Sequence, residues 1–192
     1  MLLAGLTSLL LPLMAGCMSL STLQSPEVLP PGENRVGAGV LLGVDLEGGE
    51  SGIGELAILG RRGLSENVDM GGRTLGIPPY VGLYGDLRYQ IVRDPVFVSG
   101  GLGASVFHFD DFTTVGIYPT VLADSDRLFG GIKWTQLVGG GGDVEDTFGA
   151  GFPGLVAGTG FGQSLIFSPE VINVYFGEGT TVLPGLTVQF QF

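Results

Sequence analysis

The stretch YVGLYGDLRYQIV, residues 80–92, decides the fold because its polar and large apolar side chains alternate with a period of two. Asp86, Arg88 and Gln90 occupy even positions. The odd positions carry the apolar side chains, namely Val81, Leu83, Leu87, Tyr89 and Ile91. Because successive side chains of a β-strand point to opposite faces, the segment predicts a strand with one polar face and one apolar face.

A strand of this length is long enough to cross a membrane, which takes about 9–11 residues of tilted β-strand. An arginine on the lipid face at mid-membrane costs about 2–4 kcal/mol, whereas a folded protein is stable by only about 5–15 kcal/mol in total. The face that carries Asp86 and Arg88 must therefore point inward if this strand spans a membrane.

The same alternation recurs from residue 35 onward, and no helical period persists there. We predict an all-β fold, a closed antiparallel transmembrane β-barrel of about ten strands in an up-and-down meander, or eight strands if two weak segments are loops. Pro119 and Pro169 fall inside two strands, where we expect bulges or breaks. The ten expected strands are 35–46, 52–61, 67–76, 80–92, 96–108, 112–123, 128–138, 151–162, 165–176 and 183–192.

Charged residues on the polar faces predict a charge network inside the barrel. The lumen of a barrel of eight to ten strands is about wide enough for side chains to fill it, so we expect these charges to pair and close the lumen. A narrow channel is the alternative. The predicted network consists of Arg35, Asp45, Glu55, Asp69, Arg73, Asp86, Arg88, Lys133 and Glu170, with Arg61 on the same faces.

Composition limits the possible functions of the 192-residue chain. A net charge of −11 argues against binding to nucleic acid, which requires Lys and Arg against phosphates. Cys17 is the only cysteine, which excludes an intramolecular disulfide and a cysteine-based zinc site. His108 is the only histidine, lies at an expected strand end and predicts no catalytic triad. We expect no enzyme activity and no cofactor.

The first 16 residues predict a signal peptide, because their apolar run is too short for a transmembrane helix and has the length of a signal-peptide core, although the Lys or Arg that usually precedes such a core is missing. The sequence Met14-Ala15-Gly16-Cys17 resembles the lipobox of bacterial lipoproteins, with Met14 where that family prefers Leu. The resemblance implies cleavage before Cys17 and acylation of its side chain. An ordinary signal peptide with a chance cysteine is the alternative. Met18 after the cysteine, in place of the Asp that retains some family members in the inner membrane, favours the outer membrane.

We divide the chain into a signal peptide (1–16), a lipid anchor and tether (17–34) and a barrel domain (35–192). The Pro-containing tether could alternatively pack into the mouth of the barrel. The C-terminal LTVQFQF, residues 186–192, ends an alternating strand on Phe192 and resembles the terminal strand of bacterial outer-membrane barrels. That resemblance implies recognition by the barrel-assembly machinery.

The anchor places the start of the barrel domain in the periplasm, and an even number of strands returns its end to the same side. The charge distribution supports this orientation. The expected periplasmic turns hold Arg61, Arg62, Arg93 and Arg127. The expected outer loops are acidic, at Glu47, Glu50, Asp110, Asp111, Asp143, Glu145, Asp146 and Glu178. Such loops could hold divalent cations, although solvation alone accounts for them.

Three hypotheses for function follow. The first is a structural or surface-interaction protein of the outer membrane, in contact with its lipids. The second is a narrow pore or small-molecule binder that uses the charged lumen. The third is a soluble β-sandwich lipoprotein that only its lipid holds at the membrane.

Overall fold

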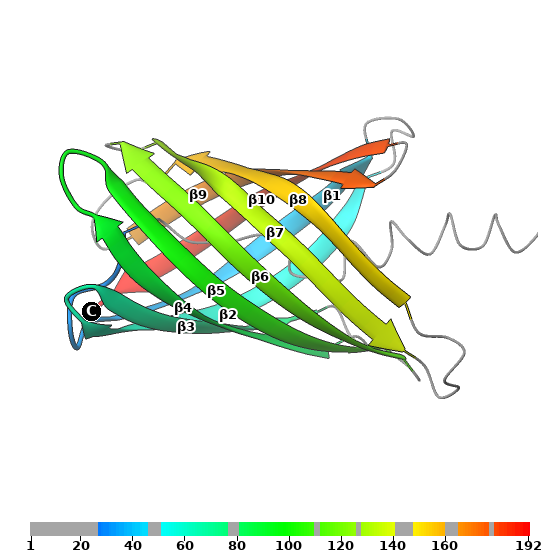
Figure 1. Ribbon diagram of the computed structural model, residues 1–192, viewed down its shortest axis with the longest axis horizontal. Helices are drawn as coiled ribbons and strands as arrows, with labels where there is room; N and C mark the ends of the chain where they lie inside the picture. The colour runs from blue at the N-terminus through cyan, green and yellow to red at the C-terminus, as the bar shows by residue number, and fades with distance from the viewer. Residues whose placement is uncertain are drawn as a thin grey trace, which may run out of the picture.

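The computed structural model describes residues 27–45, 51–76, 81–109, 112–125, 128–140, 148–159, 165–176 and 179–192. Within them lie ten β-strands (Figure 1). Their bounds are β1 (Asn34–Asp45), β2 (Ser51–Ser65), β3 (Val68–Leu75), β4 (Val81–Val92), β5 (Phe97–Phe109), β6 (Phe112–Ser125), β7 (Leu128–Gly140), β8 (Phe148–Thr159), β9 (Leu165–Phe176) and β10 (Gly179–Gln191). The expected strands are all present, with ends displaced by up to four residues.

The strands form one closed barrel in which each strand pairs antiparallel with its neighbours in the chain. The ring closes where β1 pairs with β10, from Arg35 opposite Gln191 to Asp45 opposite Thr181. Asn34 and Phe192 complete this seam, since each donates its backbone N–H to the other's carbonyl oxygen at 2.8 and 2.9 Å. One closed ring differs from the two packed sheets of a β-sandwich, so the third hypothesis is wrong about architecture.

The end of the barrel where β1 begins and β10 ends is called the mouth below; it lies at the left of Figure 1, where the C-terminus is marked. The β2–β3 and β4–β5 connections lie at the same end. Arg93 directly follows β4, as predicted for a turn. Arg61 and Arg62 do not lie in a turn, because β2 continues to Ser65 and keeps both in the strand.

Pro119 does not cause a bulge. Strand β6 continues through it, and the register with β7 is the same at Ile117–Gln136 as at Thr120–Lys133. Between these two positions the pairing of β6 with β7 is interrupted. This interruption fits the expected break in the ladder, because proline has no N–H to donate. Pro169 pairs with Leu186 of β10, and the pairing of β9 with β8 ends one residue away, at Glu170.

The two faces of the barrel wall have opposite character. Strand β4 alternates between exposed and buried positions, with Leu87 and Tyr89 exposed and Arg88 and Gln90 buried. Lys133 and Thr135 of β7 are buried, whereas Ile132 and Trp134 are exposed. The predicted parity is therefore confirmed on these strands. Among the described residues, no helix is long and apolar enough to cross a membrane.

Candidate functional site

The segment 27–33, EVLPPGE, lies inside the mouth and is called the strap below. It turns away from β1 at Pro30-Pro31-Gly32-Glu33, where the Glu33 N–H donates to the Pro30 carbonyl oxygen at 3.1 Å. Gly32 has a φ of 83°, a left-handed conformation that glycine adopts readily. Proline second and a positive-φ glycine third are typical of a type II turn. The turn directs the chain from the barrel wall into the lumen.

The strap contacts side chains from β3 and β4. The Val28 N–H donates to Gln90 Oε1 at 2.9 Å. The Leu29 N–H donates to Asp69 Oδ2 at 3.0 Å. The carbonyl oxygen of Glu27 accepts a hydrogen bond from Arg88 Nη2 at 3.1 Å. Inward polar side chains thus satisfy the backbone of the strap where no ladder is present.

The side chains of Val28 and Leu29 are among the most buried of the described chain, with 3% and 1% of their surface exposed. Gly63 of β2 is necessary for this packing, since a Cβ atom there would lie 2.6 Å from the Leu29 carbonyl oxygen. The backbones of strap and wall also exchange two hydrogen bonds, Gly32 N–H to Gly63 O and Gly63 N–H to Glu33 O, both at 3.0 Å. The sequence therefore leaves room for the strap in the wall itself.

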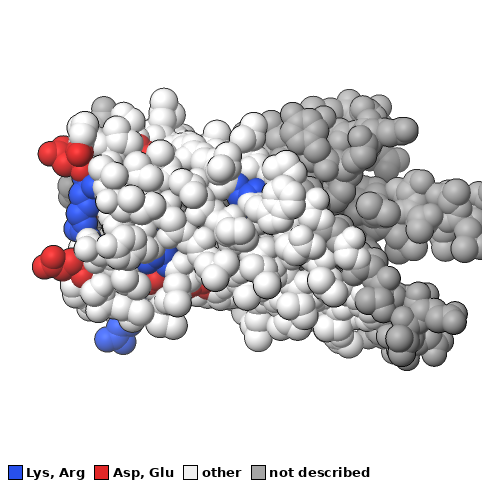
Figure 2. Space-filling view, viewed as in Figure 1, with Lys and Arg blue, Asp and Glu red and all other residues white. Residues whose placement is uncertain are grey.

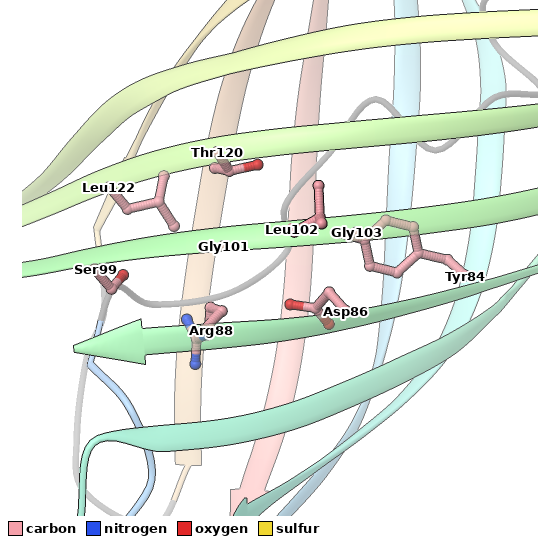
Figure 3. A pocket seen from close by; sticks show the side chains of 9 residues that line it. All are labelled: Tyr84, Asp86, Arg88, Ser99, Gly101, Leu102, Gly103, Thr120 and Leu122. Carbon is pink, nitrogen blue, oxygen red and sulfur yellow. The ribbon is translucent and has the colours of Figure 1, made fainter. Parts of the chain in front are cut away.

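A buried ion-pair cluster lies under the strap. Asp69 of β3 is fully buried and pairs with both Arg61 of β2 and Arg88 of β4, the second at 2.8 Å. Arg61 also pairs with Asp86 of β4, at 2.6 and 2.5 Å to the two carboxylate oxygens. Figure 3 shows Asp86 and Arg88 projecting from β4. Two arginines and two aspartates thus neutralise each other across three adjacent strands, a geometry that offsets the cost of removing these charges from water.

Two tyrosines and two basic residues occupy the middle of the lumen. The rings of Tyr84 and Tyr118 have centroids 5.6 Å apart and are tilted by 53°. The guanidinium of Arg73 lies 4.5 Å from the Tyr84 ring centroid, and the Lys133 ammonium lies 4.4 Å from that of Tyr118. Both distances are typical of cation–π contacts. The Tyr118 hydroxyl and Ser105 Oγ form a hydrogen bond of 2.7 Å.

Glycines on the inner wall let both tyrosine rings lie close to it. A Cβ atom at Gly103 would lie 2.8 Å from Cε2 of Tyr84. A Cβ atom at Gly116 would lie 2.9 Å from Cε2 of Tyr118. Real Cβ atoms do not approach other atoms so closely, so each ring occupies the place of a missing side chain. The rings consequently lie against β5 and β6 and do not extend across the lumen.

A cavity of about 10 Å³ lies between the tyrosines and the mouth, lined by Tyr84, Asp86, Arg88, Ser99, Thr120 and Leu122 among others (Figure 3). This volume is close to the minimum that a single water molecule requires. It has no room for an organic ligand, which needs roughly 300 Å³ or more. This cavity is therefore not a binding site for an organic ligand.

The structure brings three of the nine residues of the predicted network into one cluster and places three others apart from it. Arg35 is buried and donates to Gln191 Oε1 at 2.7 Å, and Gln191 in turn donates to the strap carboxylate of Glu33 at 2.5 Å. Asp69, Asp86 and Arg88 form the cluster, which Arg61 joins. Arg73 and Lys133 lie with the tyrosines, apart from the cluster. The side chains of Asp45, Glu55 and Glu170 lie outside the described residues, as does Cys17.

Sequence reasoning missed the roles of Tyr84, Tyr118 and Gln90. The sequence pattern placed these three residues on the inner face. It did not indicate that the two tyrosine rings would lie against glycines. His108 is exposed near the outer end of β5 and contacts Thr113 Oγ1 at 3.0 Å. Among the described residues, no three His, Cys, Asp or Glu side chains lie close enough to hold a metal ion. The acidic cluster Asp143, Glu145 and Asp146 lies outside them.

Comparisons with known proteins place this chain near no characterised family. No protein-family model matches it, and no curated protein matches it significantly. Among solved structures it is similar to two of Ail, the attachment invasion locus protein of Yersinia pestis, at 8% identity, covering 84% of this chain and 99% of that chain. The TM-scores are 0.29 and 0.30, and one of the two is a complex with the heparin analogue sucrose octasulfate. A likeness this distant carries no argument about function.

Proposed function

We propose that this chain is a small outer-membrane β-barrel, anchored by a lipid at Cys17, with a structural or surface-interaction role and a filled lumen. One observation carries the proposal. Large apolar side chains in the middle of the strands point away from the barrel and are widely exposed, for example Ile58, Leu102 and Ile132 with 70%, 60% and 60% of their surface accessible.

Hydrocarbon is the environment that this exterior fits. Soluble monomers rarely expose contiguous apolar patches beyond a few hundred Å². Here exposed apolar residues occur on every strand from β1 to β8 and on β10. On the face shown in Figure 2, acidic and basic atoms gather mainly at the mouth end and leave most of the described exterior uncharged. A closed ring also satisfies its own backbone groups, which a span through lipid requires.

The two ends of the barrel domain support a periplasmic mouth. Asn34 and Phe192 are hydrogen-bonded to each other at this end, so the first and the last strand of the barrel domain both have an end there. The assembly machinery would bind the strand that ends at Phe192. The segments 1–16 and 17–34 would serve as signal peptide and anchor, although the described part of the second packs into the mouth and is not a free tether.

We expect interaction and not catalysis, because Arg61, Arg88 and the two aspartates of the buried cluster pair with one another. Contacts with other molecules would then involve the loops at the end opposite the mouth. Divalent cations at the acidic residues of those loops remain part of this proposal.

Membrane extraction of a Cys17→Ala variant tests the proposal. We expect the variant to stay in membranes washed with carbonate or urea, because the barrel itself spans the bilayer. We also expect gel migration in detergent to change on boiling. Mass spectrometry should find the added mass of the lipid on the wild-type protein and not on the variant, and this difference would support the anchor. Release of the variant by the wash, with migration that boiling does not change, would refute a membrane-spanning barrel.

A further inference from the structure

We propose that the strap is a displaceable plug, and that the barrel conducts small ions when residues 27–33 leave the mouth. This inference rests on the proposed membrane-spanning barrel and adds an activity to it. It comes from how the described lumen is filled, and three features of the structure support it.

The first feature is the width of the ring. Eight strands already give an interior that side chains just fill, and ten strands give a wider one. At Gly63 the wall has no side chain, and Leu29 and Pro30 of the strap occupy the place that a Cβ atom would take. Near the mouth, the strap therefore fills space that wall side chains leave open. Among the described residues, the strap is the one segment outside the strands that packs inside it.

The second feature is that the strap and the ring are held by different bonds. The ring closes through the β1–β10 ladder, which does not involve the strap. Beyond the Pro30–Glu33 turn, the strap backbone is held by the side chains of Asp69, Gln90 and Arg88. The strap can therefore leave its site while every strand pair remains intact.

The third feature is the surface that the strap would leave behind. Arg88, Asp69 and Gln90 would lose their strap partners and face the opening, where water can hydrate them. In the middle of the lumen, Tyr84 and Tyr118 lie against the wall over Gly103 and Gly116 and do not cross it. A polar path along these groups suits hydrated inorganic ions and excludes large solutes.

The test compares single-channel currents of the full-length wild-type protein and a Leu29→Asp variant in planar lipid bilayers bathed in KCl. A carboxylate at position 29 would lie buried beside Asp69, so it should expel the strap without altering the wall. Leu29→Met is the matched control, because it changes the same buried side chain, adds no charge and nearly conserves its volume. We expect at least a tenfold rise in mean conductance for Leu29→Asp over wild type, and none for Leu29→Met.

A glutamate-specific protease reports independently whether the strap has left. The bond after Glu27 precedes buried Val28, so it should be protected in wild type and in Leu29→Met, and cleaved in Leu29→Asp. Cleavage together with current supports the plug. Cleavage of Leu29→Asp without current would show that the strap does not control conduction. Protection of the bond after Glu27 in Leu29→Asp would show that Leu29 does not hold the strap in place. Either of the latter results overturns the inference, as does a wild-type current equal to that of Leu29→Asp.

A second pair of variants approaches the same contact from the wall. Gly63→Leu places a side chain where Leu29 and Pro30 lie, whereas Gly60→Leu in the same strand meets no atom within 4 Å. We expect current from the first and not from the second, and silence from both would count against the plug. Migration that changes on boiling shows that each variant still forms the barrel. Failure of wild type on that criterion would refute the membrane barrel, whereas a correctly migrating, silent set of variants would refute the plug alone.

Discussion

The two faces of strand β4 differ in the opposite sense to those of a soluble sheet. Outward-facing Leu83 and Leu87 have 58% and 55% of their surface exposed, whereas inward-facing Arg88 and Gln90 have 4% each. The strand thus buries its charge and exposes its hydrocarbon, which is the reverse of a water-soluble strand. The difference teaches that the inner face is matched to polar partners in the lumen and the outer face to apolar surroundings, which the proposed membrane would supply.

The two faces also differ in how specific their interactions are. Contact with lipid is non-directional, so outward positions require only apolar character. Inside, each group depends on a particular partner, as Asp69 does on Arg61, Arg88 and the Leu29 N–H. Substitutions should therefore have their largest effects where a buried partner is lost, smaller ones where charge enters lipid, and the smallest where packing alone changes.

The largest effect is expected from Asp69→Ala, which removes the shared acceptor of the ion-pair cluster. Breaking a buried pair by removing one partner costs about 3–5 kcal/mol, because an uncompensated charge remains. We expect a decrease of this size in the free energy of unfolding, measured by denaturant titration in lipid vesicles. Asp94→Ala, at an exposed turn position, should change it by less than about 0.5 kcal/mol. Equal effects would show that the cluster does not stabilise the barrel.

An intermediate effect is expected from Leu87→Arg, which places a guanidinium in lipid at the middle of β4. Arginine at the bilayer midplane costs about 2–4 kcal/mol, and near the interface about 0–1 kcal/mol. Leu128→Arg is the matched control, since Leu128 is exposed at the first residue of β7, near the mouth. The same titration should separate the two variants. If Leu128→Arg cost as much as Leu87→Arg, depth in a bilayer could not be the cause.

The smallest effect is expected from Gly103→Val, which fills the place that the Tyr84 ring occupies. Overpacking of a filled interior costs about 1–3 kcal/mol. Gly85→Val adds the same side chain to an exposed position where the nearest atom would be 3.8 Å away, and should cost nothing measurable. Fluorescence of the tyrosines should also change in the first variant and stay constant in the second. A change of tyrosine fluorescence in both variants would show that valine disturbs the strands themselves and not the contact of the Tyr84 ring with Gly103.

Much of the barrel was predictable because strand parity is a local property. The alternation of Asp86, Leu87 and Arg88 placed each side chain on its correct face, and the closed ten-strand meander agrees with the expected segments. The extent of β2 was not predictable, since nothing in its sequence stops the strand at Arg61. The strand continues through Gly63, which pairs with the strap, and ends at Ser65. The Pro-containing sequence of the predicted tether likewise does not indicate that residues 27–33 pack inside the mouth of the barrel.

The sequence by itself determined which side chains point outward and which point into the lumen, because a period of two along a strand fixes the face of every residue. The tertiary structure decided which inward groups touch one another. Arg61, Asp69 and Arg88 lie on different strands, and only the register of the closed ring sets the distances between them. The strap gained its place in the same way, where closure brought Gly63, Asp69 and Gln90 around one opening.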